Sequence, residues 1–341
     1  MDLYQQLRNP VALSVFLCTL LLPILVGLIA MFRTKNQSDF FIGGRAMNKF
    51  VVALSAVSSG RSSWLVLGVS GMAYMRGVGA VWAVVGYITA EMFQFVFIGR
   101  RLREQSEEYG SLTLLDYLES RHNDYGHFIR IVGACIIGIF VTAYVAAQFN
   151  AGALSLSTGL GLPHFFSNLF GDHPFVVSQL PIIAALLFGG LLILIYMVLG
   201  GYIAVAYNDV IRAIIMILGL IVLPLAGLIR LGGLKSLLLT LSNLNPAYVD
   251  STSLGAGVII GFLGIGLGSP GQPHILVRYM SIDDPDRLRQ STVIGTIWNV
   301  LMAWGAVFIG LLGRVLIPQA DALPDGNSEM IYLVLLGCNS D

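Results

Sequence analysis

Long apolar runs recur along the whole of this chain. They cover residues 10–32, 50–74, 78–98, 128–152, 178–199, 208–231, 253–277 and 291–317, and a ninth run begins near residue 329. Each of the first eight reaches the length of about 18 or more residues that a bilayer-spanning helix needs. The runs are continuous and do not alternate with polar residues, which favours helices over a closed β-barrel. The ninth run is too short to span, so we expect either a truncated chain or a half-helix, with truncation the preferred interpretation.

The composition agrees with this pattern. The chain has 341 residues, of which 56% are hydrophobic and 11% charged, with a mean hydropathy of +0.80. Soluble domains carry roughly 25% charged residues. The sequence therefore predicts an all-α polytopic membrane protein whose partner is the lipid bilayer. A net charge of zero gives no indication of nucleic-acid binding, and no nucleophile–base or metal-ligand arrangement suggests an enzyme.

Basic residues are distributed unevenly between the two sides that these runs define. Thirteen fall in the loops of one side: Arg33, Lys35, Arg45, Lys49, Arg100, Arg101, Arg103, Arg121, Arg130, Arg212, Arg278, Arg287 and Arg289. Five fall on the other side: Arg8, Arg76, Arg230, Lys235 and Arg314. Cytoplasmic loops carry an excess of lysine and arginine. We therefore expect a multi-pass protein of the inner (plasma) membrane with its N-terminus outside.

Two of the apolar runs contain segments that weaken a helix. The second run holds SSGRSS at 58–63, and the seventh holds GFLGIGLGSPGQPHI at 261–275. Glycine, proline and serine hydroxyls all compete with helical hydrogen bonding. A pair of interrupted helices in corresponding positions indicates a transporter built of inverted repeats, with its solute and ion sites between the interruptions. For the seventh run, close glycine packing followed by an ordinary proline exit is the alternative.

A single arginine, Arg61, lies inside the second run. It is about 16 Å from the start of that run at the helical rise per residue. A charge at such a depth costs about 2.5–3.5 kcal/mol, so it requires a cavity or a partner. Glu91 in the third run is about 13 Å from the same membrane face. We therefore predict an Arg61–Glu91 ion pair, the alternative being that Glu91 bonds to water or a hydroxyl near the cytoplasmic mouth.

Other polar residues also lie in or at the ends of apolar runs. Tyr144 and Gln148 are four residues apart in the fourth run and so share one helix face. They fit contact with a solute and hydrogen bonding between helices equally well. Asp209 and Arg212, at the start of the sixth run, fit a juxtamembrane ion pair with a structural role.

At several of these segments the chain resembles the sodium:solute symporter family, most closely its sodium/proline branch. The matching segments, in order, are SDFFIGGRAMNKFVVALSAVSS, SSWLVLGVSGMAY, RRLRE with SLTLLDYLESR, GGYIAVAYNDVIRA and GIGLGSPGQPHILVRYMS. The resemblance covers essentially the whole chain and implies a LeuT-like inverted-repeat fold. It implies one transmembrane domain over 1–341, with a peripheral first helix and loop (1–45), a five-helix repeat (46–231) and a partial second repeat (253–341).

The resemblance also implies roles for individual residues. Arg45 matches an arginine that the family uses for coupling on the cytoplasmic side. Ser62 and Trp64 match positions near the ion and substrate sites, and Tyr144 matches a tyrosine of the substrate region. Asp209 matches the acid that follows the GG motif.

Backbone carbonyl groups of Ser58 and Arg61 match those that help to hold sodium in the family. The chain also departs from the proline branch. It has Gly60 and Arg61 where that branch has an aspartate and a methionine, and Ile265 and Ser269 where that branch places a tryptophan and a tyrosine against the solute. These departures argue against proline itself.

These observations predict a secondary active transporter. It would couple sodium, or a proton, to symport of a small organic solute such as proline, another amino acid or a carboxylate, with no other cofactor. Arg61 would either replace the coupling cation or bind a substrate carboxylate. The candidate solute-binding residues are Arg61, Ser62, Trp64, Tyr144, Gln148 and Ser269. The candidates for ion binding or coupling are Ser58, Arg61, Ser62, Arg45, Glu91 and Asp209. The alternatives are a non-transporting sensory module and a non-functional truncated transporter.

Overall fold

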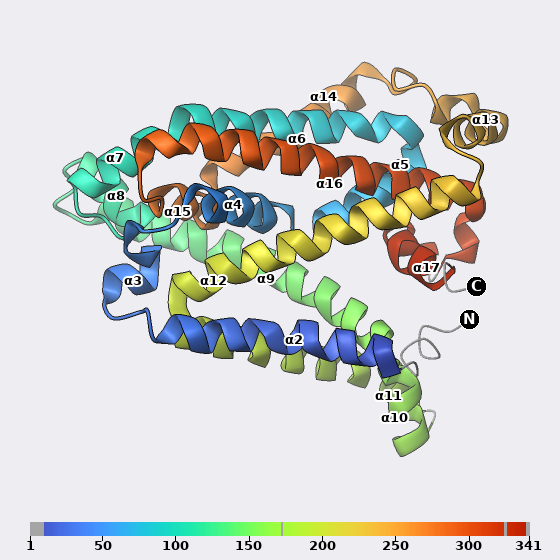
Figure 1. Ribbon diagram of the computed structural model, residues 1–341, viewed down its shortest axis with the longest axis horizontal. Helices are drawn as coiled ribbons and strands as arrows, with labels where there is room; N and C mark the ends of the chain where they lie inside the picture. The colour runs from blue at the N-terminus through green and yellow to red at the C-terminus, as the bar shows by residue number, and fades with distance from the viewer. Residues whose placement is uncertain (1–9, 172, 324–325, 339–341) are drawn as a thin grey trace. The chain divides into compact units, whose positions relative to one another are not determined.

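The structure, a computed structural model, describes residues 10–171, 173–323 and 326–338, and it is all-helical (Figure 1). Within those ranges no β-strand occurs, and the one extended contact is an isolated bridge between Met47 and Ile282. The helices fall into two compact units. Unit 1 consists of residues 10–45 and 108–208, and unit 2 of residues 46–107 and 209–338, apart from the gaps given above.

Unit 1 is organised around two long helices and the first part of a third. Its elements are α2 (Pro10–Met31), α3 (Gln37–Ile42), η1 (Gly43–Arg45), α8 (Leu114–Arg121), α9 (Phe128–Gly159), α10 (Leu162–Phe170), α11 (Pro174–Ser178) and residues 180–208 of α12 (Leu180–Arg230). Helix α2 packs closely on α12, because a Cβ on Gly200 would lie 2.7 Å from the Cβ of Ala30. Glycine is thus required where the two helices meet.

Helix α12 is divided at Gly201, whose φ of 55° and ψ of −146° lie outside the helical region. A Cβ at Gly201 would also lie 2.8 Å from the carbonyl oxygen of Phe40, so both conformation and space require glycine. The sequence predicts two runs here, 178–199 and 208–231. The structure joins them through one glycine, and helix resumes at once beyond it.

Unit 2 is larger and holds the residues that matter most for function. Its elements are α4 (Lys49–Ser63), η2 (Trp64–Val69), α5 (Ser70–Arg76), η3 (Gly77–Ala80), α6 (Val81–Phe93), η4 (Gln94–Gly99), α7 (Arg100–Glu108), residues 209–230 of α12, α13 (Leu234–Leu244), η5 (Pro246–Tyr248), α14 (Ala256–Gly264), η6 (Ile265–Gly271), α15 (Pro273–Met280), η7 (Pro285–Arg287), α16 (Leu288–Leu316), η8 (Ala320–Ala322), η10 (Ser328–Met330) and α17 (Ile331–Cys338). Helix α16 packs against α4 and α5, and α6 packs against α14 and η6 (Figure 1). The core includes Val57, Leu65, Met302 and Ala306.

The two predicted interruptions have different outcomes. In the seventh run the interruption is confirmed, since α14 passes into the 3₁₀ segment η6 and Gln272 is extended (φ −85°, ψ 109°) before α15 begins. In the second run the prediction of a break at 58–63 is wrong. Helix α4 continues through Ser63, and the irregular part is the π-helical segment η2 that follows. A serine whose hydroxyl bonds to another side chain does not compete for the backbone hydrogen bonds of its helix. In α4 the hydroxyls of Ser55 and Ser59 both donate to the Asp209 side chain.

All eight predicted apolar runs are helical over most of their length in the described part of the chain. Length and composition qualify four continuous helical stretches to cross a membrane, namely Trp64–Glu108, Phe128–Ser157, Pro174–Arg230 and Pro285–Leu316. The stretch Pro174–Arg230 contains two of the predicted runs. Two shorter apolar stretches, Leu17–Met31 and Ala256–Gly271, belong to the first and seventh runs.

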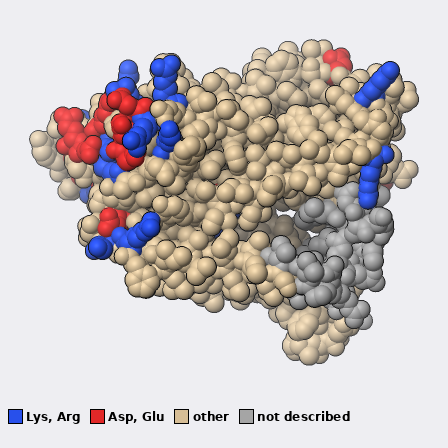
Figure 2. Space-filling model, in the orientation of Figure 1, with Lys and Arg blue, Asp and Glu red and all other residues tan. Residues whose placement is uncertain are grey.

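Many charged side chains gather near α7, while the surface along the middle of α6 shows none (Figures 1 and 2). Arg100 forms an ion pair with Asp286 at 2.9 Å, and Arg103 donates to the carbonyl of Ile282 at 2.7 Å. The sequence places both loops on the same membrane face. Loops assigned to the opposite face also meet, since Arg314 donates to the hydroxyl of Tyr248 at 2.6 Å.

Glycine at position 305 sets how closely α16 approaches the second half of α12. A Cβ there would lie 1.8 Å from the carbonyl oxygen of Leu220, so Gly305→Ala must push backbone apart. We expect this substitution to lower the free energy of unfolding by about 1–3 kcal/mol. Thermal unfolding in detergent measures it, with Gly261→Ala as the control because a Cβ there meets nothing within 4 Å. Equal unfolding midpoints for the two variants would contradict the packing described.

Candidate functional site

The centre of unit 2 holds the buried arginine that the sequence singles out. The Arg61 side chain is 1% exposed and forms an ion pair with Glu91, which confirms the predicted pair. Its Nε donates to Oδ1 of Asn299 at 2.7 Å. Its guanidinium carbon lies 3.1 Å from the centre of the Tyr87 ring. The charge is therefore neutralised by one carboxylate and held in place by an amide and an aromatic face.

Three helices bring these groups together. Helix α4 begins at an Asn48 cap, whose side chain accepts from the backbone N–H groups of Phe50 and Val51, and it carries Arg61. Glu91 lies one turn after Tyr87 on α6, and Asn299 comes from α16. The Nδ2 of Asn299 also donates to Oε2 of Glu91. Asn299 therefore contacts both charged partners.

Asn299 was not among the residues that the sequence analysis selected. It is 2% exposed and lies in the apolar segment TIWNVLMAW of the eighth run. An amide in such a segment is the same kind of signal that drew attention to Arg61. Aromatic residues complete the surroundings: the Tyr87 hydroxyl donates to the Gly60 carbonyl at 3.1 Å, and the Trp64 and Tyr87 rings lie 5.4 Å apart.

A second buried ion pair connects α4, α12 and α15. Arg278 donates to Oδ2 of Asp209 at 2.9 Å, and the hydroxyls of Ser55 and Ser59 each donate to the same oxygen at 2.8 Å. The side chains of Arg278 and Asp209 are 7% and 5% exposed. The sequence selected Asp209 but not this partner, which lies 69 residues further along the chain in the GQPHILVRYM segment.

The interrupted helix is tied to α6 and to the segment that follows α6. Gln94 donates to the Ser269 hydroxyl at 2.6 Å and accepts from the Tyr279 hydroxyl at 3.2 Å. A Cβ on Gly266 would lie 2.8 Å from the Gly86 carbonyl oxygen. The glycines of η6 thus serve close packing as well as the interruption. Ser269 is buried at this junction.

The remaining candidate residues come from both units. Arg45, Tyr144 and Gln148 belong to unit 1. Arg45 has a φ of 55° and donates to the Ser111 carbonyl at 2.8 Å, while Tyr144 and Gln148 are half-buried on α9. On α4 the Ser58 side chain is buried, and the Ser62 side chain lies outside the described part of the structure. The carbonyl of Arg61 accepts the backbone N–H of Trp64.

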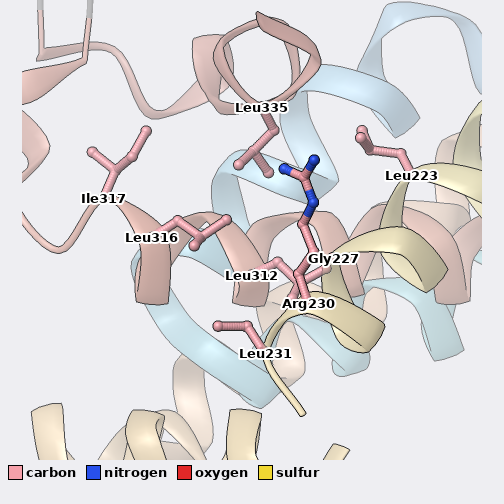
Figure 3. Close-up of a pocket in the computed structure, with 8 residues that line it drawn as sticks. All are labelled: Leu223, Gly227, Arg230, Leu231, Leu312, Leu316, Ile317 and Leu335. Carbon is pink, nitrogen blue, oxygen red and sulfur yellow. The ribbon is translucent and has the colours of Figure 1, made fainter. Parts of the chain in front are cut away.

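Two hollows occur in the described part of unit 2. One, of about 220 Å³, is lined by apolar residues of α12, α16 and α17 with Arg230 beside them (Figure 3). The other, of about 460 Å³, is lined by residues of α6 and of the interrupted helix, including Gly86, Phe93 and Leu267. None of the candidate site residues lines either hollow. Arg61 and Glu91, at 1% and 2% exposed, are enclosed by protein.

Apolar helices of membrane-spanning length, an interrupted helix and two buried ion pairs define a polytopic helical membrane protein with a polar interior. Comparison with known proteins specifies the family. The model of the sodium:solute symporter family matches residues 40–337. The chain belongs to the sodium:solute symporter family, as the resemblance in its sequence predicts.

Curated relatives support this membership. The sodium/proline symporter of Salmonella typhimurium is 32% identical over 317 residues, which are 92% of this chain and 60% of that protein. The high-affinity proline transporter of Bacillus subtilis is 30% identical over 295 residues, which are 85% of this chain and 58% of that protein. The chain therefore spans about three fifths of the length of the curated relatives it matches.

A solved structure shows the same fold. A Na⁺-coupled sialic acid symporter, determined in a substrate-bound outward-open state, matches with a TM-score of 0.72 at 17% sequence identity. The match covers 94% of this chain and 65% of that one. The described helices thus have the LeuT-like fold that the family resemblance implies.

Proposed function

We propose that this protein is a secondary active transporter that couples the movement of sodium to symport of a small organic solute. The observation that carries the proposal is the interrupted helix in unit 2, with buried charges on the helices packed around it. Polar groups and irregular backbone at membrane depth mark solute and ion pathways. The names of the relatives, which are sodium/proline symporters, support sodium as the coupling ion.

The site roles follow the sequence-based assignment. The solute would contact Arg61, Ser62, Trp64, Tyr144, Gln148 and Ser269. Ions or coupling would involve Ser58, Arg61, Ser62, Arg45, Glu91 and Asp209. The two inverted repeats would cover 46–231 and 253–341, with 1–45 peripheral, and the N-terminus would lie outside the plasma membrane. The solute would be proline, another amino acid or a carboxylate.

Two roles for Arg61 lead to opposite results. If its guanidinium replaces a coupling cation, solute uptake will not depend on sodium. If Arg61 binds a substrate carboxylate, sodium dependence will remain in the wild type and Arg61→Met will abolish uptake.

We expect the full gene product in proteoliposomes to accumulate a labelled amino acid or carboxylate when sodium is high outside. A tenfold sodium gradient, at one sodium per solute, supports at most about tenfold accumulation, since a factor of ten is about 1.4 kcal/mol. Two control experiments use the same proteoliposomes: one replaces external sodium by choline, and the other imposes a proton gradient in place of the sodium gradient. The proposal fails if no solute accumulates above protein-free liposomes under the sodium gradient.

A further inference from the structure

The Arg61–Glu91 pair leaves two polar atoms open. Glu91 receives both of its donors, from Arg61 and Asn299, on Oε2. Its other oxygen, Oε1, and the Nη1 of Arg61 are buried without a hydrogen-bond partner among the described residues. A buried polar atom without a partner is costly, and more so when the group is charged. The cluster therefore has one charged acceptor, Glu91 Oε1, and one charged donor, Arg61 Nη1, that a ligand could bond.

Charge balance restricts what that ligand can be. Arg61 and Glu91 neutralise each other, and both are enclosed, at 1% and 2% exposed. A monocarboxylate added to this cluster would leave one net negative charge inside the protein, and an amine would leave one net positive charge. Both are strongly unfavourable away from water. A group that carries one charge of each sign satisfies both open atoms and leaves the cluster neutral.

We propose that Arg61 and Glu91 act together as a charge filter that selects solutes with a zwitterionic head group. The solute carboxylate accepts from Nη1 of Arg61, and its ammonium donates to Oε1 of Glu91. In the absence of solute, the two side chains neutralise each other. This inference rests on the proposed transport function and assigns Glu91 to the solute, in addition to its pairing with Arg61.

Neighbouring groups fix the geometry of this filter. Asn299 bonds to both charged side chains, and the Tyr87 ring lies against the guanidinium. The hydroxyl of Tyr87 is in turn bonded to the Gly60 carbonyl of α4. Because Nε and Nη2 of Arg61 are both engaged, Nη1 is the donor that remains for a solute. Asn299 is a positioning residue in this arrangement.

The test uses the full gene product in nanodiscs and measures the shift of its unfolding midpoint and its Kd for added compounds. The compounds are the twenty standard amino acids, each beside one analogue that lacks the ammonium group and one that lacks the carboxylate. For proline these are cyclopentanecarboxylate, in which CH2 replaces the ring nitrogen, and pyrrolidine. We expect at least one amino acid to bind about tenfold or more tightly than either of its analogues, because each analogue leaves one buried charged atom unpaired.

Two variants should change this preference in opposite directions. Glu91→Gln leaves the positive charge of Arg61 and should reverse the order in favour of the carboxylate analogue. Arg61→Gln leaves the negative charge of Glu91 and should favour the amine. Thr89→Val is the matched control on α6, since that exposed hydroxyl donates only to the Val85 carbonyl of its own helix at 2.7 Å. General structural damage cannot produce opposite reversals.

The affinities of the wild-type protein for the amino acids and their analogues test the inference even if the variants fail to fold. The inference is overturned if an analogue binds as tightly as its amino acid, or if a transported solute carries a net charge. It is also overturned if no amino acid binds while another solute is transported, in which case a resident water satisfies the open atoms. In all three cases the proposed transport function stands. Absence of uptake under any cation gradient would instead refute the proposed function.

Discussion

Replacing Glu91 by leucine will lower the free energy of unfolding by about 3–5 kcal/mol. The substitution leaves the Arg61 guanidinium buried at membrane depth without its carboxylate, beside Asn299 and the Tyr87 ring. An uncompensated charge in such a place is among the most destabilising changes that a single substitution can make. Equilibrium unfolding of the purified protein in detergent measures the effect.

The double variant Arg61→Met/Glu91→Leu provides the matched control. It removes both charges and keeps side chains of similar volume, so it should recover most of the loss, because replacing a buried pair by apolar residues is often neutral. The coupling energy between the two positions should therefore be large. Strictly additive effects of the two single substitutions would show that the pair does not act as a unit.

The second large effect is expected at Asp209. Asp209→Asn removes the charge that balances Arg278 and leaves a neutral amide oxygen to accept from Arg278, Ser55 and Ser59. We expect a loss of about 3–5 kcal/mol in unfolding free energy, as for other broken buried pairs. Thermal or denaturant unfolding in detergent reports it directly.

Asp250 offers a matched control in the same unit. It is exposed, and its Oδ1 accepts from the backbone N–H and hydroxyl of Thr252 at 2.8 and 2.7 Å. Asp250→Asn retains an oxygen acceptor, so a change within about 0.5 kcal/mol is expected, as for surface substitutions generally. If Asp209→Asn were as mild as Asp250→Asn, the Arg278–Asp209 pair would not contribute to stability as described.

The Arg61–Glu91 pair could be predicted because it depends on little besides helical rise. The second and third apolar runs follow each other through a short turn, so counting residues from a shared face gives the depth of each charge. The pairing of Asp209 with Arg278 could not be found that way. These residues are 69 positions apart, and whether α12 and α15 meet depends on packing of the whole of unit 2.

Local helix propensity predicted one interruption correctly and one wrongly, for a physical reason. Proline and glycine act on the backbone itself, so η6 and the extended Gln272 follow from GSPGQP directly. Serine weakens a helix only when its hydroxyl bonds to the backbone, so its effect on the helix depends on the partner of that hydroxyl. Ser55 and Ser59 bond Asp209, a partner that the sequence does not reveal, and α4 remains helical.

The π-helical segment η2 has a consequence for how chain length can vary. A turn closed by an i→i+5 hydrogen bond holds one residue more than an α-helical turn. Loss of one residue between Trp64 and Val69 would therefore convert the segment to ordinary α-helix and leave the register beyond it unchanged. The close contact of the Ser70 carbonyl with Gly310 would be preserved. A one-residue deletion, which elsewhere rotates a helix against its neighbours, can therefore be accommodated at this point.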